Sequence, residues 1–121
     1  MGKILIILIL VVLAAFGFIY FEKETNNSVD EEFIQCLAEA GVVIYGSKTC
    51  GGCSQLVEEY GGYDAIKPIY LDCSEFGSQE ELKRCFEERQ SEYVPEVQIN
   101  GEVFEGWGSP QALSDATGCQ I

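Results

Sequence analysis

The feature that most constrains this chain is the placement of its six cysteines, all of which follow residue 35. Two form a Cys50-Gly51-Gly52-Cys53 motif, and the other four are spread over the same segment: Cys36, Cys73, Cys85 and Cys119. An even number of cysteines in a small domain outside the cytosol is typical of a disulfide framework, because a small hydrophobic core needs the added stability. We therefore expect disulfides, although six cysteines allow many pairings.

The N-terminal segment differs in composition from the rest. It carries no charge from Ile4 to Phe21, and as a helix this run would measure roughly 27 Å, close to the hydrocarbon thickness of a bilayer. Lys3 precedes the run and acidic residues follow it, which places the N-terminus in the cytoplasm by the positive-inside rule. We predict a single-pass signal-anchor over residues 1–21 and an extracytoplasmic domain at the cell membrane. The alternative is a cleaved signal, which would make the protein secreted.

Residues 22–29 are polar and lack apolar periodicity, which predicts a tether before a single folded domain at residues 30–121. The chain has 20 acidic and seven basic residues and no histidine. This balance argues against binding to nucleic acid or to anionic lipid head groups.

The order of secondary structure can be predicted from caps, turns and apolar periodicity. Asp30 and Ser78 are expected to cap helices, Ser109-Pro110 to begin the last one, and Asn100-Gly101 to form a hairpin turn. The expected strands are residues 42–45, 66–72, 94–99 and 102–105, and the cysteine pair opens a helix after the first. The predicted fold is α/β, in the order α-β-α-β-α-β-β-α, with a mixed four-stranded sheet and flanking helices.

The Cys50–Cys53 spacing brings two sulfur atoms within one helical turn. Cys50 would lie at the helix N-terminus, where unpaired N–H groups and the helix dipole favour a thiolate, so it is the expected nucleophile. Cys53 would resolve the mixed disulfide. Lys48, two residues upstream, is expected to add to the thiolate character.

A zinc or iron–sulfur site uses the same cysteine spacing. The pair nevertheless follows a predicted strand and opens a helix in a βαβ unit, which favours redox chemistry. We therefore expect no metal and no cofactor. A Cys-ligated metal protein is the less favoured alternative.

Several motifs of the chain can be compared with known families: Phe33-Ile34-Gln35-Cys36-Leu37, Gly41-Val42-Val43-Ile44-Tyr45-Gly46, Cys50-Gly51-Gly52-Cys53, Leu71-Asp72-Cys73, Cys85, Val94-Pro95, Ile99-Asn100-Gly101 and Gly118-Cys119. They resemble the thioredoxin superfamily, and more closely the thioredoxin-like domain fused to, or partnering, bacterial and archaeal vitamin K epoxide reductase homologues. The resemblance covers about residues 33 to 119. It implies a thioredoxin-like fold in which a cis-proline strand at Val94-Pro95 faces the active disulfide.

The resemblance also implies a function. The protein would be a thiol–disulfide oxidoreductase that exchanges disulfides between exported substrate proteins and a quinone-linked membrane reductase. Val94, Pro95 and Lys48 would position the substrate. The alternative from another class is a redox-silent thioredoxin-like binding module, in which the Cys50–Cys53 bond is structural.

The other four cysteines are expected to form structural disulfides. Cys73 and Cys85 bracket a loop and a helix start, and Cys36 and Cys119 lie near the two ends of the domain. We expect the pairs Cys73–Cys85 and Cys36–Cys119. The alternative is that Cys73 or Cys85 relays electrons to Cys50.

Overall fold

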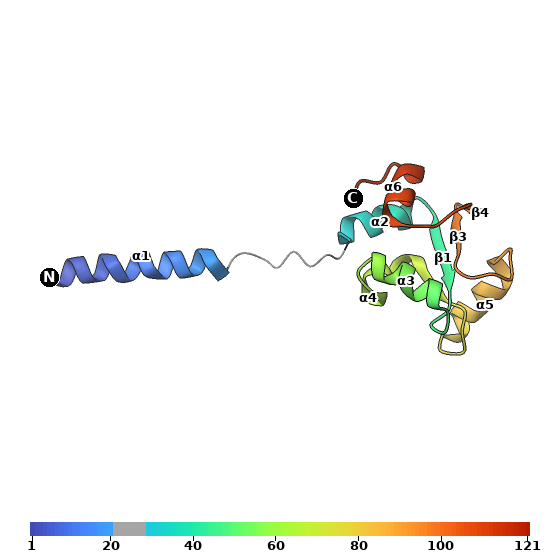
Figure 1. The fold of residues 1–121 in the computed structure, drawn as a ribbon, viewed down its shortest axis with the longest axis horizontal. Helices are drawn as coiled ribbons and strands as arrows, with labels where there is room; N and C mark the ends of the chain where they lie inside the picture. The colour runs from blue at the N-terminus through green and yellow to red at the C-terminus, as the bar shows by residue number, and fades with distance from the viewer. Residues whose placement is uncertain (21–28) are drawn as a thin grey trace.

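A computed structural model describes residues 1–20 and 29–121 of the chain (Figure 1). The elements in chain order are α1 (Gly2–Tyr20), α2 (Glu31–Glu39), β1 (Val42–Gly46), α3 (Gly51–Glu59), α4 (Tyr63–Ile66), the 3₁₀ helix η1 (Lys67–Ile69), β2 (Tyr70–Asp72), α5 (Gln79–Glu88), β3 (Glu96–Ile99), β4 (Glu102–Val103) and α6 (Pro110–Thr117). The predicted tether at 22–29 lies outside the described residues, except for Val29, which packs against the core.

The helix α1 corrects the prediction of a membrane anchor. In the described ranges, no helix combines the length and the apolar character needed to cross a membrane. The predicted transmembrane helix was therefore wrong, and so was the single-pass localisation at the cell membrane.

Four strands form one mixed sheet in the order β2-β1-β3-β4. β1 and β2 are parallel, with Gly46 opposite Asp72 at their carboxyl ends. β3 runs antiparallel to β1 and pairs Glu96 with Tyr45, and β4 returns antiparallel to β3. The hairpin turn between β3 and β4 is made by Asn100 and Gly101, both at positive φ, as the predicted Asn-Gly turn requires.

The segment before β2 differs from the prediction. A strand was expected over 66–72, but helical turns replace it up to Ile69. Pro68 has no N–H for a strand ladder and its φ suits a helical turn, and the buried residues Ile66 and Ile69 have the spacing of a helix face. The predicted order has no place for α4 and η1. The thioredoxin-like fold is thus corrected to an α/β fold with a mixed four-stranded sheet.

Local signals at helix starts were predicted correctly. The Asp30 side chain accepts a hydrogen bond from the backbone of α2, and Ser109 caps α6 with Pro110 as its first residue. Ser78 and Glu81 form a reciprocal capping box at α5. These contacts satisfy N–H groups that have no partner within a helix.

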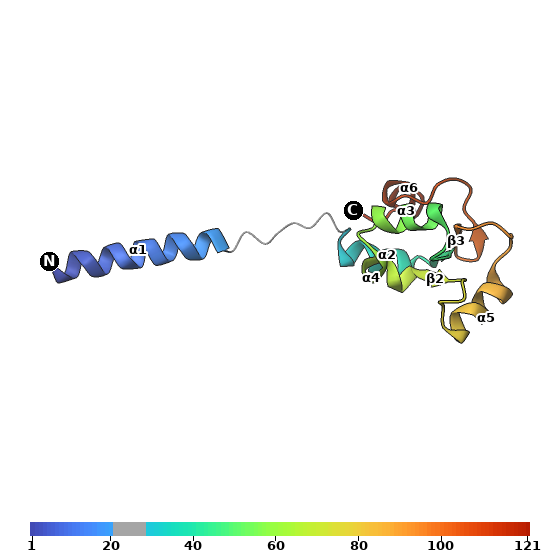
Figure 2. The ribbon, with the colours of Figure 1, turned by 60° about the horizontal axis from the view of Figure 1, so that its bottom comes forward.

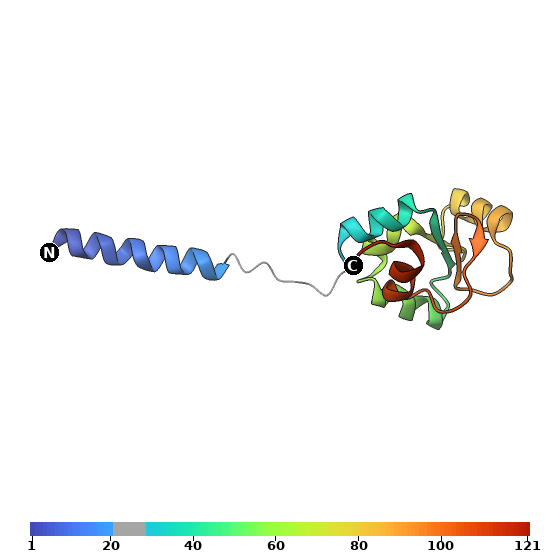
Figure 3. The same ribbon diagram turned by 90° about the horizontal axis from the view of Figure 1, so that it is seen from above.

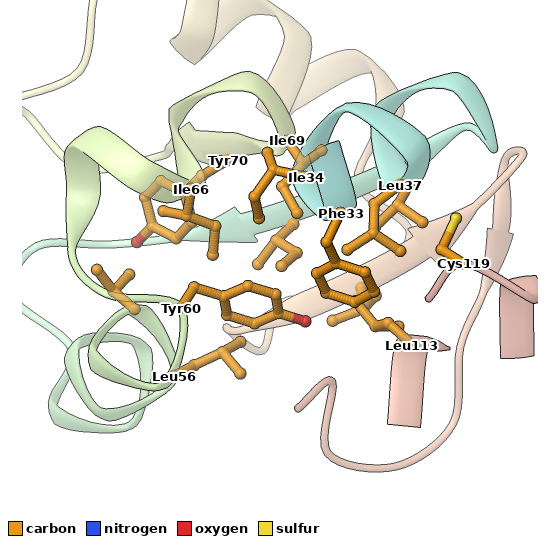
Figure 4. Close-up of a cluster of buried hydrophobic side chains, with 14 residues drawn as sticks. Phe33, Ile34, Leu37, Leu56, Tyr60, Ile66, Ile69, Tyr70, Leu113 and Cys119 are labelled. Carbon is orange, nitrogen blue, oxygen red and sulfur yellow. The ribbon is translucent and has the colours of Figure 1, made fainter. Parts of the chain in front are cut away.

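The core is divided by the sheet, because side chains alternate along a strand. Val42 and Ile44 of β1 join a larger cluster that contains residues of α2, α3, α4, η1 and α6 (Figure 4). Tyr45 joins a smaller cluster with Leu71 of β2 and Cys85 of α5. Figures 2 and 3 accordingly show α5 separated from α3 by the strands.

Candidate functional site

The cysteine pair lies at the junction between β1 and α3. After Gly46 the chain makes a turn in which the Cys50 N–H donates to the Ser47 carbonyl over 3.1 Å. Cys50 is the N-cap of α3, and its sulfur accepts a hydrogen bond from the Cys53 N–H at 3.3 Å. The side chain of Cys50 is partly exposed, whereas Cys53 is fully buried. The pair therefore has one sulfur that solvent can reach and one that it cannot.

The pKa values of the two thiols are shifted in opposite directions. Hydrogen bonds from the Cys53 side chain, the Cys53 N–H and the Gly52 N–H hold the pKa of Cys50 below its usual value. Burial, together with the hydrogen bond to Cys50, raises the pKa of Cys53 to about 12. The thiolate is the nucleophilic form of cysteine, and its charge is favoured by donors at a helix N-terminus. Cys50 is the thiol of the pair that can attack.

The loop before β3 brings Val94 and Pro95 to the same site. The Cys50 sulfur lies 3.7 Å from the Val94 carbonyl oxygen, and the Val94–Pro95 peptide bond is cis. A Cβ atom on Gly52 would lie 3.9 Å from the Pro95 Cδ, so the proline ring lies beside the first turn of α3. Both residues are half-buried next to the accessible sulfur.

Lys48 contacts an aromatic ring of α4. Its ammonium group lies 5.7 Å above the centre of the Tyr63 ring, at a distance typical of a cation–π contact. The groups that lower the Cys50 pKa are instead in Cys53 and Gly52. Lys48 therefore belongs to the neighbouring surface formed with α4, and the thiolate is stabilised by the helix end.

Glu96 is a residue of this site that the sequence analysis missed. The residue is 4 % exposed. Its carboxylate accepts hydrogen bonds from the Gln90 N–H at 3.0 Å, the Ser91 N–H at 2.7 Å and the Gln98 side-chain amide at 2.8 Å. Burial alone would raise the Glu96 pKa, but these hydrogen bonds together lower it. Glu96 thereby holds the loop that carries Val94 and Pro95. An acidic residue directly after Pro95, on the same strand face as Gln98, was the available signal.

The remaining cysteines are paired. Cys36 is bonded to Cys119 across a sequence separation of 83, and Cys73 to Cys85 across a separation of 12. These are the pairs that the sequence analysis expected. The free thiols of the structure are Cys50 and Cys53.

The described ranges, 1–20 and 29–121, contain no group of three or more cysteine or acidic side chains arranged to hold a metal ion. A scan against models of protein families finds no match to this chain, and no curated protein matches its sequence. The resemblance to the thioredoxin superfamily therefore stays a prediction from the motifs.

Proposed function

We propose that this protein is a thiol–disulfide oxidoreductase that acts on protein thiols and disulfides through Cys50 and Cys53. The observation that carries the proposal is the asymmetry of the pair: an accessible thiol with a lowered pKa lies beside a buried thiol with a raised one. Structural cysteines have no need of this difference. A nucleophile and its resolving partner do, because the first must be a thiolate and the second must wait for the mixed disulfide.

The exchange would proceed in two steps. The Cys50 thiolate attacks a substrate disulfide, a bond forms between Cys50 and one substrate sulfur, and the other substrate sulfur leaves as a thiolate. Cys53 then loses its proton and attacks the Cys50 sulfur, which forms the Cys50–Cys53 disulfide and releases the second substrate thiolate. Two electrons pass to the substrate, and the reverse sequence oxidises a substrate dithiol. The partner that renews the pair is proposed, from the sequence resemblance, to be a quinone-linked membrane reductase.

Val94 and Pro95 are proposed to position the substrate. The Val94 carbonyl lies beside the Cys50 sulfur, so a peptide joined to Cys50 has to pass this segment. Free backbone groups next to a reactive sulfur can pair with an extended substrate chain through main-chain hydrogen bonds. This contact would orient the mixed disulfide for attack by Cys53.

Trapping of the mixed disulfide tests the proposal. The reduced Cys53→Ser variant is incubated with a disulfide-bonded protein such as insulin, and adducts are identified by non-reducing electrophoresis and mass spectrometry. We expect stable adducts through Cys50, because the resolving thiol is absent, and none with the matched Cys50→Ser variant. If neither variant forms adducts, and the wild-type pair stays oxidised in glutathione buffers that reduce ordinary redox disulfides, the pair is structural and the chain is a binding module.

A further inference from the structure

A small pocket opens next to the cysteine pair, and its residues take no part in the exchange described above. It measures about 240 Å³ and is lined by α4, η1, β2, the segment that follows β2 and the start of α5, together with Lys48 from the turn before Cys50. Because β1 and β2 are parallel and end at Gly46 and Asp72, which lie opposite each other, the pocket and the cysteine turn share one edge of the sheet. Small-molecule sites usually occupy about 300–1,000 Å³, so this volume suits one long side chain better than a whole cofactor.

Two residues of the pocket lining each carry a buried polar atom that has no hydrogen-bond partner among the described residues: the Tyr70 hydroxyl and the Asp72 Oδ2. Tyr70 is 7 % exposed and Asp72 is 5 % exposed. The other carboxylate oxygen of Asp72, Oδ1, accepts hydrogen bonds from the N–H and the hydroxyl of Ser74. These bonds fix the side chain but do not involve Oδ2. Buried polar groups are nearly always paired, so these two atoms indicate a ligand that supplies hydrogen-bond donors.

The pocket already attracts a cation. The Lys48 ammonium lies above the Tyr63 ring, whose plane is nearly perpendicular to that of the Tyr70 ring at a centroid distance of 5.6 Å. If Lys48 turned outward to solvent, the lining would keep one basic side chain, Lys67, and three acidic ones, Asp64, Asp72 and Glu81. The formal charge of the pocket would then be negative. The chain as a whole has a formal net charge of −13, which favours encounters with cationic partners.

We propose that this pocket binds an arginine or lysine side chain of the substrate, close to the cysteine that Cys50 attacks. The cationic head would displace Lys48 from the Tyr63 ring and donate hydrogen bonds to Asp72 and Tyr70. The aliphatic stem would lie against Tyr63 and Phe76, which are both partly exposed at the pocket. This inference rests on the proposed oxidoreductase function and adds a preference for basic residues near the substrate cysteine.

The test uses short capped peptides that carry one cysteine as a mixed disulfide with thionitrobenzoate and, close to it, either arginine or uncharged citrulline. The reduced full-length protein attacks each peptide, and released thionitrobenzoate gives the rate constant. We expect the arginine peptide to react roughly tenfold faster, the effect of a charge-assisted hydrogen bond with an aromatic contact. Asp72→Asn, which keeps an oxygen for Ser74, and Tyr70→Phe should bring the ratio towards one, and Lys48→Met should raise it.

Asp115→Asn is the matched control, because it makes the same change of charge at an exposed position of α6. Its ratio should equal that of the wild type. Equal rates for both peptides in the wild type, or the same ratio in Asp72→Asn as in Asp115→Asn, would overturn the proposal, since attraction by net charge alone would then explain any preference.

A binding experiment separates this inference from the oxidoreductase proposal. The same peptides with alanine in place of cysteine are titrated into the protein, and the ring resonances of Tyr63 and Tyr70 are followed by NMR. Shifts with arginine but not with citrulline support the pocket even if no thiol exchange occurs. Exchange with a small aromatic disulfide, but no ring shifts and no peptide preference, would leave the oxidoreductase and remove the pocket.

Discussion

Cys50 and Cys53 show how far two identical side chains can differ within one helical turn. Cys50 ends the turn after β1, so its sulfur faces the N–H groups of α3. Cys53 is three residues further, on the side of α3 that packs into the domain. The first sulfur receives hydrogen bonds that stabilise a negative charge, and the second loses the water that would do so.

This difference predicts two separate titrations of the reduced pair. The rate of Cys50 alkylation by iodoacetamide should rise with a midpoint below the ordinary cysteine value of 9.0, because only the thiolate reacts. In a Cys50→Ser variant, Cys53 should still react slowly at neutral pH, because its burial, the largest cause of its raised pKa, remains. Mass spectrometry of quenched samples gives both profiles. A Cys50 midpoint at or above 9.0 would contradict the proposed nucleophile.

At the scale of elements, the loop between α5 and β3 depends on Glu96. The carboxylate accepts hydrogen bonds from backbone groups of the loop and lies directly after Pro95. The loop is otherwise irregular from Arg89 to Pro95. A buried charge therefore holds the segment that lies beside Cys50.

Glu96→Gln should lower the free energy of unfolding by about 2 kcal/mol at neutral pH, because hydrogen bonds to a charged group are lost in a buried site. The folded-state pKa of Glu96 is lowered from 4.5, so its contribution is present above the unfolded-state pKa and is lost as pH falls through the lower folded-state value. Urea unfolding over a pH series measures this. The difference from wild type should shrink in acid, whereas the exposed Glu102→Gln control should show little difference at any pH.

Elements with local signals could be predicted from the sequence, and those set by packing could not. Ser78, Ser109 and Asn100 act within a few residues, so their caps and turn were found correctly. The strand expected around Pro68 was wrong, because Ile66 and Ile69 are buried on helical turns that only the whole core selects. For the same reason the contact of Lys48 with Tyr63 and the role of Glu96 were missed, since each joins segments that are distant or irregular.

At the scale of the molecule, two disulfides join parts of the chain at very different separations. Cys36–Cys119 ties α2 to the segment after α6, and Cys73–Cys85 ties the end of β2 to α5. A bond that closes a longer loop removes more conformational entropy from the unfolded chain. The first bond should therefore stabilise the domain more than the second.

Replacing Cys36 and Cys119 with alanine should lower the free energy of unfolding by about 4.5 kcal/mol, and replacing Cys73 and Cys85 by about 3 kcal/mol. Urea unfolding of the two double variants and the wild type gives the comparison. Cys50 and Cys53 are kept reduced in all samples, so that they add no third constraint. An equal loss in the two variants, or a larger one for the shorter loop, would show that loop length does not govern these bonds.

The bond between Cys36 and Cys119 also makes the backbone from residue 36 to residue 119 a covalent ring. A protease that cuts one peptide bond in this ring outside the segment between Cys73 and Cys85, for example near the exposed Tyr93, opens the ring but releases no fragment. Both new chain ends stay attached to the same molecule through sulfur. The cysteine pair and the strands around it therefore stay in a single covalent piece after such a cut, for as long as this one bond is oxidised.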